Sequence, residues 1–167
     1  MEFASDRYKL QRLMASSSAG ISRRQAILET LSISAGDQIM DVGCGGGHLL
    51  EHLAKAVGEK GHVYGVDPSE DQIAQARGKC SDFENVSLLN SNADDISLEQ
   101  NSCNSITSTQ AFEYIKDIDA ALHEATRILI SGGAFVNISI LWDHFKFFGA
   151  EEKLNNRIHD TFRAHCS

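Results

Sequence analysis

The sequence predicts an α/β fold in which a doubly wound, mostly parallel sheet carries helices on both faces. From Gly36 onward, short apolar segments alternate with amphipathic helical ones, as in parallel sheets with crossover helices. A glycine-rich turn joins the first apolar segment to the next helical one, which is where such sheets bind ligands. The 167 residues are enough for one ordinary domain with its own core.

Five strands and three helices make up the predicted core. The strands are short apolar runs, and the helices carry apolar residues at spacings of three and four. Strands are expected at 38–42, 62–66, 86–90, 105–109 and 134–141, and helices at 48–57, 70–80 and 118–129. Gly58 and Gly61, and later Gly132 and Gly133, are expected where a helix stops and the next strand begins.

Further helices are expected on both sides of this core. Segments 8–15 and 22–31 carry apolar residues at helical spacing, and segment 16–20 links them. Segment 151–166 shows the same spacing at Leu154, Ile158 and Phe162, which predicts one more amphipathic helix.

The composition excludes several classes of partner. There are 15 Lys and Arg against 23 Asp and Glu, a net charge of −8 without basic clusters, so no nucleic-acid partner is expected. No segment has the apolar run of a signal peptide or the length of a membrane span. The four cysteines lack CxxC pairing, which fits a reducing compartment. We therefore expect a cytoplasmic protein with a small-molecule substrate and no membrane partner.

The turn after the first strand contains an acid followed by alternating glycines. Asp41 precedes Gly43, Gly45 and Gly47; such glycines permit positive φ and a close ligand, and the next helix offers free N–H groups. The pattern is not the dinucleotide G-x-G-x-x-G, because His48 stands at the third glycine position counted from Gly43. A carboxylate here repels a pyrophosphate and attracts an ammonium or a sulfonium, so the loop predicts S-adenosylmethionine. The alternative is a turn selected for tight packing alone.

Two more candidate sites follow the next two strands. Asp67 ends the second strand, where an acid accepts hydrogen bonds from the ribose hydroxyls of an adenosine. On its own, such a residue is more often a turn or cap residue. After the third strand comes Ser91-Asn92-Ala93-Asp94-Asp95, where an amide or carboxylate can accept from an adenine amino group. An ordinary loop explains this last segment nearly as well.

On these motifs the chain resembles the class I S-adenosylmethionine-dependent methyltransferases, in particular the small-molecule, ubiquinone-biosynthesis-like (type 11) kind with a Rossmann-like fold. The similarity covers residues 34–141, and the glycine pair at 132–133 echoes the family's Arg-x-Leu-x-Pro-Gly-Gly turn. The resemblance implies in-line transfer of a methyl group from S-adenosylmethionine to a small organic acceptor, with S-adenosylhomocysteine as product.

The resemblance also implies which residues hold the cofactor. The loop after the first strand would hold the methionine portion, Asp67 the ribose, and Asn92 with Ala93 the adenine, with Gln110 at the methionine end. The implied set is Asp41, Gly43, Cys44, Gly45, Gly47, Asp67, Pro68, Gln72, Asn92, Ala93, Asp94 and Gln110. Within one domain, residues 1–33 would cap the active site with helices, 34–149 would bind the cofactor, and 150–167 would form a C-terminal helix.

The chain departs from the family pattern at several positions. Asn92 stands where a Gly-Asp-Ala triplet has Asp, Asn104 stands where the fourth strand opens with Asp, and 130–131 replaces Lys-Pro. The family's sheet ends in an antiparallel strand pair, and nothing in 145–167 reads as that pair. We therefore expect a truncated form whose fifth strand has an open edge, covered by a second copy or a partner chain.

Methyl transfer needs a general base only if the acceptor must lose a proton. The candidates are His144, Asp143 and Tyr114, followed by Trp142, Glu113, Tyr8 and Met14. Each is as readily a loop or packing residue, so no base is assigned.

The segment from His48 to His52 matches the zinc-protease pattern H-x-x-E-H. No third ligand is recognisable and His48 adjoins the glycine loop, so no metal is expected.

Two other functions stay open. A non-catalytic S-adenosylmethionine-binding or regulatory module would explain the missing final strands. A NAD-dependent oxidoreductase would share the fold, but the glycine spacing disfavours it and no Tyr-x-x-x-Lys pair follows.

Overall fold

A five-stranded sheet forms the centre of the protein in the computed structural model, which describes residues 13, 15–139 and 151–166. Its strands are β1 (Gln38–Val42), β2 (His62–Val66), β3 (Val86–Leu89), β4 (Cys103–Thr109) and β5 (Leu129–Ile138). They lie in the order β3-β2-β1-β4-β5, and each neighbouring pair is parallel. The order reverses between β1 and β4, and open α/β sheets bind ligands at the carboxyl ends of the strands beside such a point.

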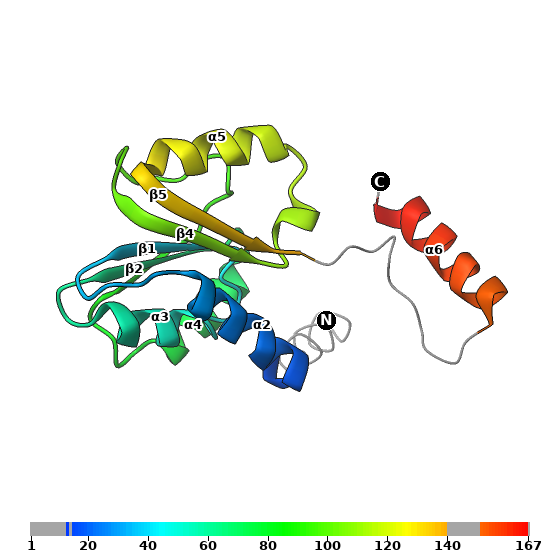
Figure 1. Ribbon diagram of the computed structural model, residues 1–167, viewed down its shortest axis with the longest axis horizontal. Coiled ribbons are helices and arrows are strands. Elements are labelled where there is room, and N and C mark those ends of the chain that lie inside the picture. The colour runs from blue at the N-terminus through cyan, green and yellow to red at the C-terminus, as the bar shows by residue number, and fades with distance from the viewer. Residues whose placement is uncertain (1–12, 14, 140–150, 167) are drawn as a thin grey trace.

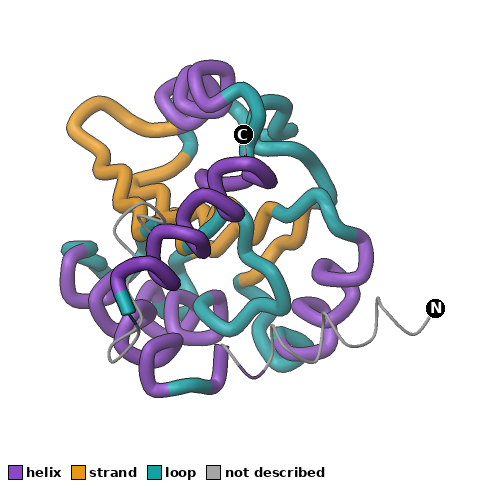
Figure 2. Tube along the Cα trace, turned by 90° about the vertical axis from the view of Figure 1, so that its right-hand side faces the viewer, coloured by secondary structure: helices purple, strands orange, loops and turns teal. Residues whose placement is uncertain are grey.

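Helices cover both faces of this sheet (Figure 1). The helices α2 (Ser18–Thr30), α3 (Leu50–Val57) and α4 (Glu70–Lys79) lie on one face, and α5 (Ile118–Ile128) lies on the other. The short 3-10 helix η1 (Phe112–Tyr114) precedes α5. The helix α6 (Glu152–Cys166) stands apart, on the side toward which the strands point, and Figure 2 shows it in front when viewed from that side. The predicted α/β, Rossmann-like class is confirmed.

The alternation of side chains along β1 divides the core into two layers. Ile39 and Asp41 project toward α2 and α3, whereas Met40 and Val42 project toward α5. The first layer contains Ile27, Ile39, Leu50, Leu53 and Val63, and the second contains Met40, Ile106, Ala125 and Ile128. Asp41 therefore enters a mainly apolar face of the sheet.

Most predicted boundaries agree with the structure to within two residues. The strands at 38–42 and 62–66 are confirmed at both ends, and α6 begins one residue later than expected. The helix expected from His48 begins at Leu50, because residues 43–49 are used by the turn that leaves β1. The expected helix at 8–15 and the end of the expected strand at 134–141 extend beyond the described residues.

The glycine pair at 132–133 lies elsewhere than predicted. It falls inside β5, which begins at Leu129 directly after α5, and not between a helix and a strand. The reason is a register shift: Cys103 pairs with Leu129 but Ser105 pairs with Ala134, so residues 130–133 bulge from the ladder. Gly132 takes φ +80° in this bulge.

The predicted link at 16–20 is shorter than expected: only Ser17 interrupts the helices, and residues 15–16 and 18–20 are helical. The helix α2 begins at Ser18, because the side chain of Ser17 caps it by accepting a hydrogen bond from the N–H of Gly20 at 3.1 Å. The helix then packs against β4 and β5.

Two further features concern the described residues only. They contain no antiparallel strand, so β5 pairs with β4 alone and its other edge is open within this part of the chain. Among the helices of the same residues, none is both long enough and apolar enough to cross a bilayer.

Candidate functional site

The glycine loop lies at the carboxyl end of β1 and is anchored on β2. The N–H groups of Gly43 and Cys44 both donate to the carbonyl of Val66, at 2.8 and 3.0 Å. The N–H of Gly47 donates to the carbonyl of Cys44 at 3.1 Å, which closes the turn ahead of α3. The side chain of Cys44 is buried in the core, so only its backbone borders the site.

Two of the glycines are explained by packing. A Cβ on Gly43 would lie 2.2 Å from the Cβ of Ala111, and one on Gly47 would lie 3.0 Å from the Cα of Ala76. Gly45 differs, because the nearest atom to its Cβ position is Oε1 of Gln72 at 3.7 Å. The φ of +52° at Gly45 favours glycine, because other residues rarely adopt it. The space beside Gly45 has no close neighbour. Packing therefore explains Gly43 and Gly47, whereas Gly45 leaves the backbone of the loop accessible to a ligand.

Asp41 is the most unusual side chain of the site. It is 3% exposed, and its Oδ1 atom has no hydrogen-bond partner among the described residues. Burial raises the pKa of Asp41 to about 8, and the nearby charge of Asp67 adds to the rise. A buried carboxylate without a protein partner is stabilised by a cation, so this position fits the ammonium of an amino acid.

Asp67 joins three segments at the end of β2. Its Oδ2 accepts from the N–H of Gly45 at 3.0 Å, and its Oδ1 accepts from the N–H of Ser69 at 2.9 Å. Its carbonyl accepts from the amide of Asn90 at 2.9 Å. The cap interpretation is therefore correct in part. Each carboxylate oxygen keeps lone-pair capacity for a further donor such as a ribose hydroxyl.

The end of β4 carries buried hydroxyls that the sequence analysis did not single out. Thr107 and Ser108 are completely buried, and within the described residues neither they nor Thr109 have a hydrogen-bond partner for the hydroxyl. The signal was present in the sequence, because a central parallel strand is normally rich in Val, Ile and Leu. The next residue, Gln110, has φ +57°, an uncommon conformation for a non-glycine residue that is enriched at functional sites.

The segment after β3 forms a turn at the same edge of the sheet. Asn92, Asp94 and Asp95 are exposed, and Ala93 packs against the core beneath α5. The hydroxyl of Ser91 is buried and has no partner in the part of the chain described. The predicted adenine segment thus offers exposed polar groups beside one buried hydroxyl.

The candidate bases are only partly within the described residues. Tyr114 ends η1 with 70% of its surface exposed, and Glu113 beside it is half-buried. Tyr8, Met14, Trp142, Asp143 and His144 lie outside the described residues. The structure therefore singles out none of these side chains as a base.

Two members of the H-x-x-E-H pattern, Glu51 and His52, have protein partners. Glu51 forms an ion pair with Lys79 at 3.7 Å, and Nδ1 of His52 lies 3.0 Å from the carbonyl oxygen of His48. Burial lowers the pKa of His48, and the charges of Lys79 and Arg24 lower it further. Cations so close to His48 oppose the binding of a dication.

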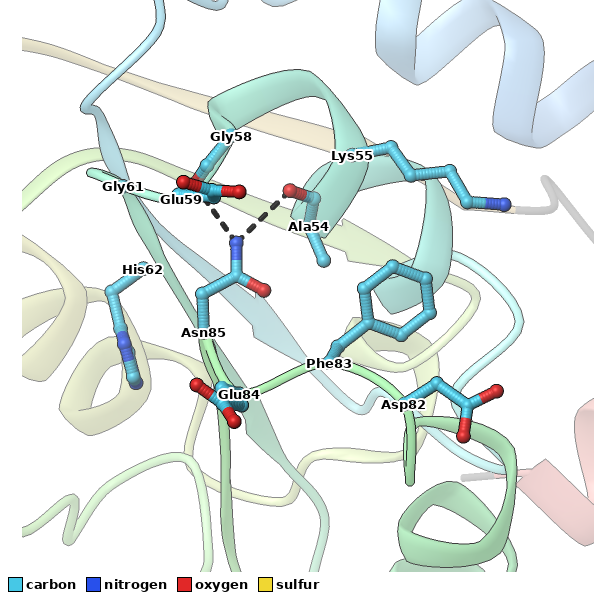
Figure 3. A pocket seen from close by; sticks show the side chains of 10 residues that line it. All are labelled: Ala54, Lys55, Gly58, Glu59, Gly61, His62, Asp82, Phe83, Glu84 and Asn85. Carbon is cyan, nitrogen blue, oxygen red and sulfur yellow. Dashed lines mark hydrogen bonds between the residues drawn. The ribbon is translucent and has the colours of Figure 1, made fainter.

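A hollow of about 690 Å³ lies at the opposite edge of the sheet (Figure 3). It is bordered by the end of α3 and by the residues that open β2 and β3. The side-chain amide of Asn85 donates to the carbonyls of Ala54 and Gly58, both at 3.0 Å, and the ammonium of Lys55 lies 5.6 Å from the ring centroid of Phe83. These contacts hold α3 against β3. The hollow is at the amino ends of the strands, away from the glycine loop.

Comparison with known proteins identifies related sequences and folds. The model of a methyltransferase domain family matches residues 33–167. Demethylmenaquinone methyltransferase of Staphylococcus aureus is 33% identical over 113 residues, which are 68% of this chain and 47% of that protein. The chain thus spans about half the length of this curated relative.

Solved structures share the fold. A SAM-dependent methyltransferase from Aquifex aeolicus superposes with a TM-score of 0.69 at 23% identity, over 84% of this chain and 77% of the other. An S-adenosylmethionine-dependent methyltransferase from Mesorhizobium loti gives a TM-score of 0.65 at 26% identity, over 72% of this chain and 54% of the other.

Proposed function

Because the chain belongs to the methyltransferase domain family, we propose that it binds S-adenosylmethionine and transfers the methyl group to a small organic acceptor. The observation that carries this proposal is the buried carboxylate of Asp41, whose Oδ1 atom lacks a partner among the described residues. The acceptor class is supported by the Staphylococcus aureus relative, which is named for demethylmenaquinone.

The roles of the site follow from its polar groups. Asp41 would accept from the ammonium of the methionine portion, and Gly45 with Gln72 would border it. Asp67, already oriented by two backbone N–H groups, would accept from the ribose hydroxyls. Gln110 would lie at the methionine end, and the segment from Ser91 to Asp94 would meet the adenine. The packing of Gly43 against Ala111 and of Gly47 against Ala76 keeps the loop close to α4 and to the segment after β4.

The chemistry asks this chain mainly to position and enclose the reactants. When bound, the cofactor supplies an activated methyl whose bond to sulfur breaks as the bond to the acceptor forms, and the sulfur becomes a neutral thioether. Asp41 would serve as a binding group for the ammonium of the cofactor, whose charge is the same before and after the transfer. The buried residues beneath the loop help to exclude water, which favours the displacement.

The acidic character of the site argues against the oxidoreductase alternative. Asp41 and Asp67 lie close enough that the charge of Asp67 raises the pKa of Asp41. A dinucleotide would place its pyrophosphate at the glycine loop, where the ionised carboxylate of Asp41 would repel it. A cationic ligand would instead be attracted to the carboxylate.

Calorimetric titration with S-adenosylmethionine, S-adenosylhomocysteine and NAD tests the ligand. We expect the first two to bind and NAD to give no heat. Binding of NAD alone would refute the proposal.

Incubation with methyl-labelled cofactor and small-molecule extracts tests the transfer itself. We expect label in an organic product. Tight cofactor binding without any transferred label would instead favour the non-catalytic binding module.

We also propose that another chain, a second copy or a distinct partner, pairs with the open edge of β5. Within the described residues β5 has one paired edge only, and its sequence contains no charged residue and no proline that would discourage pairing.

A further inference from the structure

One row of residues crosses the sheet beneath the glycine loop, on the face toward α2 and α3. The strand registers place Leu88, Gly65, Asp41, Thr107 and Val136 side by side in this row. Residues in such a row project from the same face of the sheet. Asp41 and Thr107 are its only polar side chains, and they are 3% and 0% exposed.

Asp41 and Thr107 are direct neighbours, and on its other side Asp41 meets no side chain from the row. That position is Gly65, where a Cβ would lie 2.6 Å from Cδ1 of Leu50 and 3.1 Å from the sulfur of Cys44. Both Oδ1 of Asp41 and Oγ1 of Thr107 are buried and have no hydrogen-bond partner among the described residues. A carboxylate only accepts hydrogen bonds, and a threonine hydroxyl has one to donate.

We propose that Thr107 is a positioning residue for Asp41: its hydroxyl donates toward the ionised carboxylate and so fixes the orientation and charge that Asp41 offers to a cationic ligand. Adjacent strands lie about 4.8 Å apart, a spacing that a rotation of the Thr107 side chain bridges directly or through one water. A hydrogen bond to the charged form of an acid favours that form. The identity of the ligand rests on the proposed function, whereas the coupling of the two side chains does not.

The other groups around Asp41 act against its ionisation or are engaged elsewhere. Burial and the charge of Asp67 on β2 both favour the protonated form, and the thiol of Cys44 is itself buried. Strand β5 has no titratable side chain, and the only one on β4, Cys103, lies at its opposite end.

The helices on this face offer Asp41 no opposing charge. Their side chains Ile27, Leu50 and Ile73 pack in the apolar layer on this face. Among the charged groups of these helices, Arg24 donates to the carbonyl of Ala15, and Glu51 pairs with Lys79. The hydroxyl of Thr107 is therefore the side-chain donor placed to favour a charged Asp41.

Three variants test this coupling. Thr107→Val removes the hydroxyl at nearly constant volume, and Thr107→Ser keeps it. Ser108→Ala is the matched control, because Ser108 is the next residue of β4, is equally buried without a partner, and pairs with Val42 toward α5. Urea unfolding at acid and alkaline pH verifies that each variant folds. We expect Thr107→Val to lose stability only at alkaline pH, where the ionised Asp41 is left without its donor.

The first readout is the titration of the Asp41 carboxyl carbon by NMR in the protein without cofactor. We expect Thr107→Val to raise its midpoint by about one pH unit, and Thr107→Ser and Ser108→Ala to leave it unchanged. An unchanged midpoint in Thr107→Val, or an equal shift in Ser108→Ala, would overturn the proposal.

The second readout is the dissociation constant for S-adenosylmethionine from about pH 6 to about pH 9. We expect Thr107→Val to bind about tenfold more weakly at neutral pH and to recover toward the alkaline end. If the parent binds no S-adenosylmethionine while the NMR midpoint shifts, the coupling is upheld and the cofactor assignment fails. If binding in Thr107→Val follows the pH dependence of the parent, the coupling fails and the cofactor assignment is upheld.

Discussion

The side chain of Asp41 is buried on a mainly apolar face, where its folded-state pKa of about 8 is far above that of an exposed carboxyl group. The folded state therefore holds a proton there more tightly than the unfolded state. This contribution to stability is complete below about pH 4 and is lost as the pH rises toward about 8. At alkaline pH, therefore, the buried carboxylate lowers the stability of the folded protein without ligand. At the same pH, the carboxylate is ionised and can bind a cation.

We expect Asp41→Asn to raise the free energy of unfolding at alkaline pH by more than about 1 kcal/mol, since the neutral amide carries no ionisation penalty. The same change should weaken S-adenosylmethionine binding by about tenfold or more. Urea unfolding at acid and alkaline pH, together with calorimetry, measures both effects. Equal stability of the two proteins at alkaline pH would contradict the burial argument.

At the scale of elements, the glycine loop depends on the contact between Gly43 and Ala111. Gly43→Ala places a Cβ 2.2 Å from that of Ala111 at φ +74°, so we expect a loss of about 2 kcal/mol or more. Gly78→Ala is the control: its Cβ meets nothing within 4 Å inside α4, and helix propensity predicts a gain of about 0.5–1 kcal/mol. Thermal denaturation of both variants, and of Gly43→Ala with Ala111→Gly, measures the clash. Failure of the second change to recover any stability would show that backbone strain alone is responsible.

The attachment of α3 to β3 depends on one amide. Asn85→Ala removes two hydrogen bonds to the end of α3, and we expect a loss of about 1–3 kcal/mol with unchanged cofactor affinity. Glu84→Ala changes an exposed neighbour and should alter stability by less than about 0.5 kcal/mol. Chemical unfolding and calorimetry provide the two readouts. Weakened cofactor binding in Asn85→Ala would assign the hollow a role in the function of the distant site.

At the scale of the whole molecule, we propose that another chain pairs with the edge of β5 that is open within the described residues. If a second copy pairs with it, the sedimentation coefficient should rise with protein concentration. Asn137→Lys should reduce this rise, because a charged side chain on an edge strand discourages strand pairing. Concentration-independent sedimentation of the parent protein would exclude the second copy and leave a distinct partner as the occupant.

The sequence by itself determined the fold class and predicted where the candidate site lies. The alternation of strands and helices, the glycines after Asp41 and the acid at Asp67 are local patterns. Such patterns can be read from residues close in the sequence, without knowing which distant residues they contact. Only the tertiary structure decided what depends on residues distant in the chain. The clash that requires Gly43 comes from Ala111, the bulge at Gly132 comes from the register of β4 against β5, and the polar pair of Asp41 and Thr107 exists only because β1 and β4 lie side by side. Burial and register are properties of the assembled sheet, and they give Asp41 its raised pKa and its candidate partner.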